Sequence, residues 1–202
     1  MKKLHLLLVL FLLTGSTGIV EATQPVVPVK TQGATTKLLN PKRMLPKANA
    51  AGVPFQVPFV IDPTQDDFNR FTIEDVNNDG KTWTYMTAGY IKYGYDYNNP
   101  ADDWAYIPVL VAEGETFLSL SLEMKAQYSS DKECFEVGIG AEASPESMTI
   151  VMDKDDLSHT QWETYETMFA APSSGLLYLG IHANSAKYQS GIWIRNIALS
   201  SL

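Results

Sequence analysis

The sequence has a single cysteine, Cys134, so no disulfide can form within the chain. It has only three histidines, and neither His159 nor His182 lies in a nucleophile motif such as G-x-S-x-G. The apolar run at 4–13, interrupted by His5, is shorter than the roughly 20 residues that span a membrane as a helix. These absences argue against a disulfide-stapled scaffold, a triad hydrolase and a membrane-spanning protein.

The start of the chain has the features of an export signal. Two lysines precede the apolar run at 4–13, and Val20-Glu21-Ala22 is similar to a small-residue cleavage site. No cysteine lies near the end of the run, so the lipid attachment of a bacterial lipoprotein is not predicted. We therefore expect 1–22 to be a signal peptide and the protein to be secreted or held at the cell surface.

Charge divides the remaining chain into two parts. Residues 23–58 contain five basic residues, six prolines and no acidic residue, without apolar periodicity, and this composition is typical of a flexible linker. Residues 59–202 contain 22 acidic and 8 basic residues, a net charge of −14. Because such a domain repels phosphate backbones, nucleic acid is not an expected partner.

The pattern from 59 onward predicts an all-β domain. Apolar residues alternate with polar ones from Leu118 to Met124, and the same two-residue period recurs at 135–139 and 177–181. Further strands are predicted at 68–73, 83–86, 90–93, 104–110, 165–169 and 192–199. One short helix is expected at 145–148, where proline follows Ser144. Many short strands separated by turns indicate one β-sandwich or jelly roll covering 59–202.

A candidate cation loop follows the first predicted strand. Asp75, Asn77 and Asp79 are spaced as in the first half of an EF-hand loop, and Gly80 permits the sharp turn that follows. The twelfth position is Met86 and not a bidentate glutamate. The spacing therefore predicts a calcium-type loop between two strands, with further ligands supplied from elsewhere. The alternative is a solvated turn rich in Asn, Asp and Gly.

Eight aromatic residues lie between 83 and 106. Trp83 and Trp104 are expected in the core, because indole rings carry much apolar area. The run 90–97, with Gly94, is typical of an exposed loop, and exposed tyrosines are common on recognition surfaces. The candidate ligand-binding residues are Tyr93, Tyr95 and Tyr97.

Five motifs resemble one protein family. They are F-T-I-E-D-V-N-N-D-G-K-T-W (71–83), N-P-A-D-D-W (99–104), Y-E-T-M-F-A-A-P (165–172), Y-L-G-I-H-A (178–183) and I-W-I-R-N-I (192–197). Together they resemble the choice-of-anchor J family, which is akin to the cleaved adhesin domains of secreted gingipain-type proteins from Bacteroidetes. The resemblance implies a galactose-binding-like jelly roll with structural calcium and a non-catalytic role in adhesion or carbohydrate binding.

The resemblance also bears on single residues. It places the 99–104 motif beside the cation loop, so a carboxylate of Asp102 or Asp103 would complete the calcium site. Arg195 stands where an acidic residue is expected in the closing strand, which weakens any prediction of a ligand there. Members of the family are often joined to larger enzymes or adhesins, so other domains of a longer protein are expected partners.

Three functions are compatible with these features. The first is a binding module for glycans or glycoproteins, and the second is a spacer domain of a larger secreted protein. The third is a glycosidase, which needs two carboxylates that converge on one bond. The adjacent pairs at 66–67, 102–103 and 155–156 would point to opposite faces of a strand. We therefore expect a binding module and not an enzyme.

Overall fold

The computed structural model describes residues 52–94 and 96–202. The predicted signal peptide 1–22, most of the predicted linker and Tyr95 lie outside the described residues. Sheet A contains β1 (Phe55–Gln56), β3 (Thr72–Asp75), β6 (Asp103–Val111), β8 (Glu133–Gly140), β9 (Thr149–Leu157) and β11 (Gly175–Ala183). Sheet B contains β2 (Phe59–Ile61), β4 (Trp83–Met86), β5 (Tyr90–Tyr93), β7 (Phe117–Ala126), β10 (Glu163–Ala170) and β12 (Ile192–Ser201).

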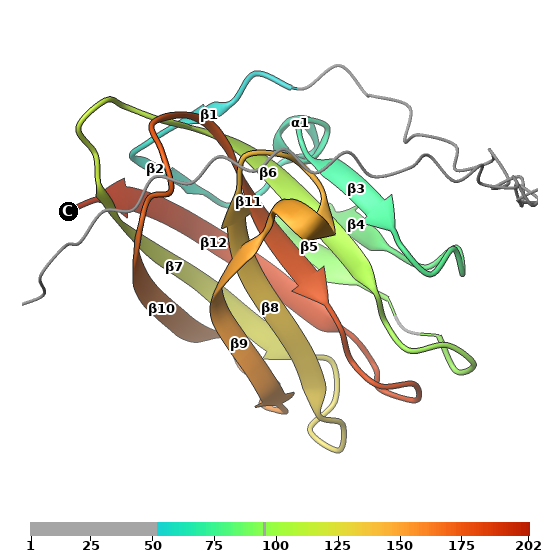
Figure 1. Ribbon diagram of the computed structural model, residues 1–202. Coiled ribbons are helices and arrows are strands. Elements are labelled where there is room, and N and C mark those ends of the chain that lie inside the picture. Colours follow the sequence, from blue (N-terminus) through green and yellow to red (C-terminus); the bar gives the residue numbers. More distant parts are fainter. Residues whose placement is uncertain (1–51, 95) are drawn as a thin grey trace, which may run out of the picture. The chain divides into compact units, whose positions relative to one another are not determined.

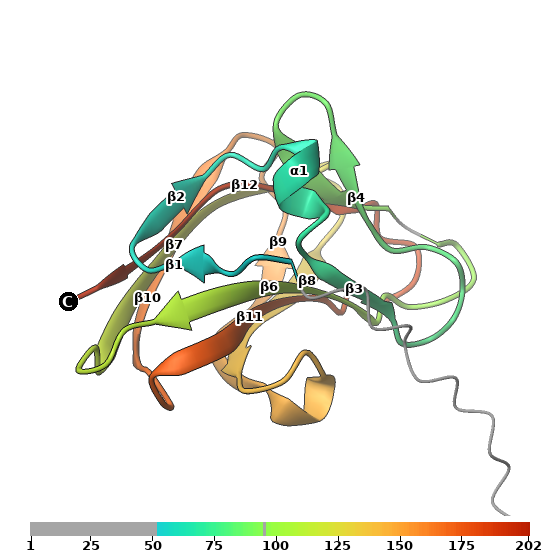
Figure 2. The ribbon, with the colours of Figure 1, turned by 90° about the horizontal axis from the view of Figure 1, so that it is seen from above.

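The two sheets pack face to face as layers of a sandwich (Figures 1 and 2). Sheet A has the order β1-β6-β11-β8-β9, with β3 also paired to β6. Sheet B has the order β10-β7-β12-β5-β4, with β2 paired to β12. Strands distant in sequence are thus neighbours, and every pairing except that of β1 with β6 is antiparallel. The prediction of an all-β sandwich is confirmed.

The core follows from the alternation in the sequence. Leu118, Leu120, Leu122 and Met124 on β7 are each fully buried, while the residues between them are partly exposed on the other side. Each buried leucine contributes roughly 2 kcal/mol through its apolar surface. The same phase recurs on β12, so both central strands of sheet B present one apolar face to sheet A.

The sandwich begins earlier than the sequence predicts. Phe55 and Val57 are 6% and 3% exposed, and β1 pairs with β6. The last residues of the predicted linker, 52–58, therefore include part of the folded domain. They were assigned to the linker because two prolines and a two-residue strand leave no periodic pattern.

Further elements differ from the prediction. The predicted strand at 68–73 divides into α1 (Gln65–Phe68) and β3. A capping box starts the helix: Asp67 N donates to Thr64 Oγ1 (3.1 Å), and Thr64 N donates to Asp67 Oδ2 (3.1 Å). The predicted helix at 145–148 is a single 3₁₀ turn, η1 (Pro145–Ser147). Strand β9 was missed because it is an edge strand that buries only Met152 and Leu157.

Candidate cation and ligand sites

The predicted calcium loop leads from β3 in sheet A to β4 in sheet B. Asp75 accepts hydrogen bonds from the backbone N–H groups of Asp79 (3.2 Å) and Gly80 (2.9 Å). Asn77 Oδ1 also accepts from the N–H of Asp79 (3.1 Å). Asn78 and Gly80 have positive φ values, 56° and 79°, which asparagine and glycine adopt most readily. The turn therefore gathers the oxygen-bearing side chains of the loop.

A buried carboxylate lies beside this loop. Asp103 on β6 is directly opposite Asp75 on β3, and its side chain is fully buried. Its Oδ1 atom has no hydrogen-bond partner among the described residues. Thr82 Oγ1 and Tyr93 Oη are near this carboxylate, and they too lack a partner of ordinary geometry in the described part of the chain. Several buried oxygen atoms near Asp103 thus have no hydrogen-bond partner among the described residues.

The environment of Asp103 disfavours its charge. Burial raises the pKa of its carboxyl to about 7, and the negative charges of Asp75 and Asp79 act in the same direction. Hydrogen bonding from the backbone N–H of Asp102 (3.3 Å) acts in the opposite direction and is outweighed. A positive ion at this place would remove the penalty, because it would interact favourably with the ionised form.

Four of the five predicted cation ligands lie in this part of the fold, and the carboxylate of Asp102 does not. Asp102 Oδ1 is 2.9 Å from His182 Nε2 on the outer face of sheet A. Within residues 52–94 and 96–202, no three carboxylate, imidazole or thiol groups are arranged to hold a metal by themselves. A cation bound here would therefore also need amide, hydroxyl or backbone oxygens, such as those of Asn77 and Thr82.

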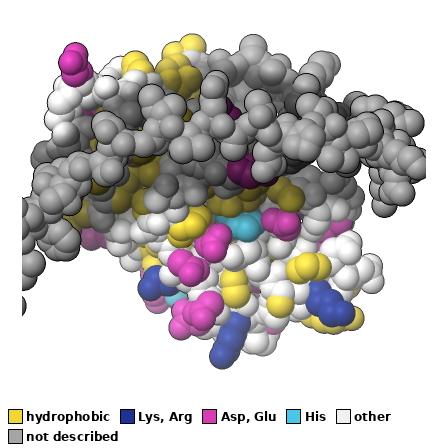
Figure 3. All heavy atoms as spheres, viewed as in Figure 1, with side chains coloured by type: hydrophobic (Ala, Val, Ile, Leu, Met, Phe, Trp, Pro, Cys, Tyr) yellow, Lys and Arg dark blue, Asp and Glu magenta, His cyan; other side chains and the backbone are white. Residues whose placement is uncertain are grey.

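The outer face of sheet A carries a stack of three rings. His182 is parallel to Trp104 at 4.3 Å, and Trp104 is parallel to Tyr106 at 5.5 Å. Glu136 Oε2 lies 3.1 Å from His182 Nδ1, and acidic side chains are common on the face shown in Figure 3. Trp104 is therefore buried, as predicted, but outside the main core. Trp83 lies in the main core.

The three predicted ligand tyrosines do not form one exposed loop. Tyr93 is 2% exposed, and its ring packs 5.8 Å from that of Trp83. Burial also raises the pKa of Tyr93. The prediction that Tyr93 is exposed is wrong, because Tyr93 is the last residue of β5 and has the inward phase. Tyr95 is outside the described residues, and Tyr97 is 61% exposed, with its ring 6.4 Å from that of Tyr188.

A different aromatic surface occupies the outer face of sheet B. We call Tyr90, Trp162 and Trp193 the aromatic platform. Tyr90 stacks on Trp193 at 5.0 Å and meets Trp162 edge-on at 5.8 Å. Trp193 lies on β12, opposite Lys92 on β5 and Lys125 on β7. Three adjacent strands therefore place one indole between two lysines.

Positive charges lie over the platform rings. Lys125 Nζ is 4.2 Å from the ring centre of Trp193 and 5.0 Å from that of Trp162. Arg195 Cζ is 4.4 Å from the ring centre of Trp162, and Lys92 Nζ is 5.9 Å from that of Trp193. These are cation–π distances. Burial, and then the charge of Arg195, lower the pKa of Lys125.

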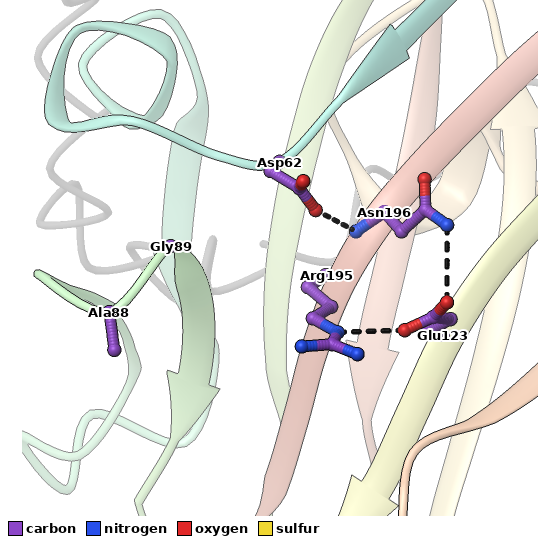
Figure 4. A pocket seen from close by; sticks show the side chains of 6 residues that line it. All are labelled: Asp62, Ala88, Gly89, Glu123, Arg195 and Asn196. Atoms are coloured by element: carbon purple, nitrogen blue, oxygen red, sulfur yellow. Dashed lines mark hydrogen bonds and ion pairs between the residues drawn. The ribbon is translucent and has the colours of Figure 1, made fainter.

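An open cavity of about 410 Å³ adjoins the platform, because Arg195 both lines the cavity and lies over the Trp162 ring. Figure 4 labels the residues that line it. Its lining residues are Asp62, Ala88, Gly89, Glu123, Arg195 and Asn196. Arg195 Nε donates to Glu123 Oε2 (2.7 Å), and Asn196 Nδ2 donates to Glu123 Oε1 (3.2 Å). These hydrogen bonds lower the pKa of Glu123. One wall of the cavity thus holds a fixed carboxylate and a guanidinium side by side.

A β-bulge on β12 shapes this wall. The pairing of β12 with β7 shifts between Arg195 and Ala198, and Asn196 has a φ of 47°. The N–H of Asn196, released from the ladder, donates to Asp62 Oδ1 (3.1 Å). Bulges re-aim side chains and are common beside functional sites. Here the irregularity lies where the side chains of Arg195 and Asn196 both meet Glu123.

The aromatic platform was not predicted from the sequence, although the position of Trp193 in its strand indicates an exposed indole. Trp193 lies between Ile192 and Ile194, which are both fully buried, so period-two alternation turns the indole outward. A tryptophan in the outward phase of a strand is unusual for a surface without a partner. Arg195, whose positive charge weakened the prediction of a ligand at the closing strand, lines the cavity.

Comparison with known proteins shows the fold. No protein-family model matches the chain, and no curated protein is similar to it in sequence. The K2 cleaved adhesin domain of Lys-gingipain is similar in structure, with a TM-score of 0.55, 12% identity and coverage of 72% of this chain and 100% of that domain. The K3 cleaved adhesin domain of Lys-gingipain from Porphyromonas gingivalis has a TM-score of 0.55 and 12% identity, with coverage of 65% of this chain and 91% of that domain.

A carbohydrate-binding structure, CBM4, is also similar, with a TM-score of 0.50, 12% identity and coverage of 65% of this chain and 86% of that one. The chain therefore shares the β-sandwich fold of cleaved adhesin domains and of a carbohydrate-binding module. In the described part of the chain, no helix is long and apolar enough to cross a membrane.

Proposed function

We propose that this domain is a non-catalytic, adhesin-type binding module that acts outside the cell and recognises glycans or glycoproteins on the aromatic platform of sheet B. The observation that carries the proposal is the platform itself: three partly exposed aromatic rings beside an open cavity of about 410 Å³. Folds shared with adhesin and carbohydrate-binding domains are compatible with this function.

The chemistry of the platform suits a sugar. Sugar rings present flat C–H faces that stack on aromatic rings, and tryptophan and tyrosine are preferred at recognition surfaces. Glu123, Asn196 and Asp62 line the adjoining cavity and can meet hydroxyl groups. One stacked ring with a few hydrogen bonds gives a dissociation constant on the order of 0.1–1 mM. Adhesion would then depend on several copies acting together.

Trp162→Ala tests the platform directly. Trp162 directly precedes β10 and its ring is partly exposed, so its removal should weaken glycan binding about tenfold or more, at a small cost in stability. Tyr128→Ala, which removes a 56%-exposed tyrosine elsewhere, is the control. Calorimetry with a set of oligosaccharides measures both. Unchanged binding by the Trp162 variant would move the site away from sheet B, and release of reducing sugar would indicate a glycosidase.

We also propose a structural calcium ion held by Asp75, Asn77, Asp79 and Asp103. Asp103 Oδ1 is buried without a hydrogen-bond partner among the residues that the structure describes, and two neighbouring carboxylates raise the pKa of Asp103 further. Calcium prefers carboxylate, amide and backbone oxygens, which are the groups present. The ion would neutralise the acidic cluster and tie sheet A to sheet B through the β3–β4 segment. Calorimetric titration of the chelator-treated domain with calcium tests the site.

A further inference from the structure

We infer that the ligand of the sheet B face is an acidic glycan, a sugar chain that carries carboxylate or sulfate groups. This inference rests on the proposed function, because it assigns the ligand class of the same platform. Its first support is the distribution of charge. Residues 59–202 contain only 8 basic residues against 22 acidic ones, yet Lys92, Lys125 and Arg195 all lie over the platform rings.

The three cations are gathered on neighbouring strands of one face. Lys92 and Lys125 flank Trp193 from the two neighbouring strands, and Arg195 adds a third positive charge two residues along β12. Burial and the charge of Arg195 lower the pKa of Lys125, as expected where like charges are brought together. Among the described residues, neither lysine forms an ion pair. An anionic ligand would supply the missing partner.

Arg195 offers the most specific contact. Its Nε atom donates a hydrogen bond to Glu123, and in Figure 4 no dashed line runs from its two terminal nitrogens to another of the six residues drawn. Glu123 is also held by Asn196 (3.2 Å), which keeps the guanidinium plane in place. A guanidinium with free N–H groups binds carboxylate or sulfate through paired hydrogen bonds. A sugar bound beside the Trp162 ring would bring such a group within reach, because the Arg195 guanidinium lies 4.4 Å from the centre of that ring.

Neutral sugars and nucleic acids explain the face less well. A neutral sugar needs the rings and the hydroxyl partners but gives no reason for three cations. Single-stranded nucleic acid could use both rings and cations. However, the remaining surface of this domain is strongly acidic, which disfavours a long, uniformly charged phosphate backbone. An acidic glycan uses the rings, the cavity and the cations together.

The experiment compares matched ligands by calorimetry on the calcium-loaded protein. Trigalacturonate is compared with its methyl ester, which has the same sugars without the charge. Sulfated chondroitin is compared with unsulfated chondroitin, which keeps the uronate carboxylates and lacks only the sulfates. We expect the more highly charged member of at least one pair to bind about tenfold more tightly, the strength of one charge-assisted hydrogen bond. The first pair reports carboxylate recognition and the second reports sulfate recognition. Binding should weaken as salt rises from about 0.05 M to 0.5 M, because added ions screen partly exposed charges.

Variants locate the effect. Arg195→Met and Lys125→Met should each lower the affinity for the more highly charged ligand about three- to tenfold and lower that for its less charged counterpart by a smaller factor. Arg195→Lys, which keeps the charge but loses the planar fork, should fall in between. Lys154→Met is the matched control, because Lys154 also lies over an aromatic ring, 5.8 Å from the centre of Tyr165, but on β9. Melting temperatures confirm that each variant is folded.

The outcomes separate the two proposals. Equal, salt-independent binding of both members of each pair would overturn the acidic-glycan inference and leave the glycan-binding proposal standing. Tighter binding of oligothymidylate than of either acidic sugar would assign the face to nucleic acid and overturn both. Failure to bind any of the four sugars, together with failure on neutral oligosaccharides, would also overturn both.

Discussion

The acidic cluster at the β3–β4 loop and the cationic platform on sheet B use charge in opposite ways. At the loop, Asp103 is fully buried and lies near two other carboxylates, and one of its oxygen atoms has no hydrogen-bond partner within the described part of the chain. On sheet B, Lys125 and Arg195 are partly exposed and rest on aromatic rings. The first arrangement strains the folded state, and the second leaves it largely undisturbed.

This difference assigns different roles to the two regions. A buried group of like charges lowers the free energy of unfolding unless a bound ion compensates the charges. Partly exposed charges over rings contribute little to stability. They remain available to a ligand. We therefore expect changes at the loop cluster to alter stability, and changes on the platform to alter binding.

The largest expected effect separates two neighbours on β5. Tyr93 faces the core and Lys92 faces the platform, because successive side chains of a strand point to opposite sides. Tyr93→Ala should lower the free energy of unfolding by about 3–5 kcal/mol, as aromatic-to-alanine changes in cores do. Lys92→Met should change it by less than about 0.5 kcal/mol. Urea denaturation measures both.

Tyr93→Phe is the control for the core assignment. The hydroxyl of Tyr93 is buried without a partner among the described residues, so its removal should be neutral or slightly stabilising. A large loss of stability in Tyr93→Phe would show that the hydroxyl has a bound partner, such as an ion or a water. A small loss of stability in Tyr93→Ala would show that Tyr93 is not a core residue. The proposed difference between a stabilising region and a binding region would then not hold on β5.

The sequence contained most of the fold because burial imposes strict alternation. Strands 83–86 and 90–93 were predicted residue for residue, and the four apolar residues from Leu118 to Met124 all face the core. Strand β1 could not be predicted, since its two residues form a strand only through pairing with β6, more than 50 positions away. The edge strand β9 was missed because it buries few side chains.

The candidate sites were predicted less well because they depend on strand order. Asp75, Asn77 and Asp79 lie within five positions of one another, so their spacing alone predicts a cation loop. Asp103 was included through the family resemblance, and its role became clear only from the pairing of β3 with β6. The platform residues Trp162 and Trp193 lie about 30 positions apart and come to the same face only because β10, β7 and β12 are adjacent.

The next effect concerns pH in the metal-free domain. The pKa of Asp103 is raised to about 7 in the folded state, whereas an unfolded aspartate titrates near pH ~4. Its contribution is fully present below pH ~4, where the carboxyl is protonated in both states, and is lost as pH rises through about 7. The loss is at most about 4 kcal/mol. Asp103→Asn should lack it, and thermal melts in chelator from pH 4 to 8 compare the two proteins.

Calcium should reverse this loss in the wild-type domain. With a dissociation constant of about 10 µM, calcium at about 1 mM adds nearly 3 kcal/mol to the free energy of unfolding. Such a gain raises the melting temperature of a domain of this size by about 5–10 °C. Asp79→Ala should abolish the response, whereas Asp153→Asn, which removes an exposed carboxylate of β9, should retain it. Equal melting temperatures with calcium and with chelator would leave the loop as a solvated turn.

The smallest effect is expected for Tyr97, the exposed member of the predicted tyrosine loop. Its ring is 61% exposed and lies 6.4 Å from that of Tyr188, which is equally exposed, so little apolar area is lost on substitution. Tyr97→Ala should therefore change the free energy of unfolding by less than about 0.5 kcal/mol. If the platform is the only glycan surface, affinity should change less than about twofold. A larger drop in affinity at unchanged stability would mean that the loop end also contacts ligand. Ligand contacts would then not be confined to sheet B, because Tyr97 and Tyr188 lie in loops outside its strands.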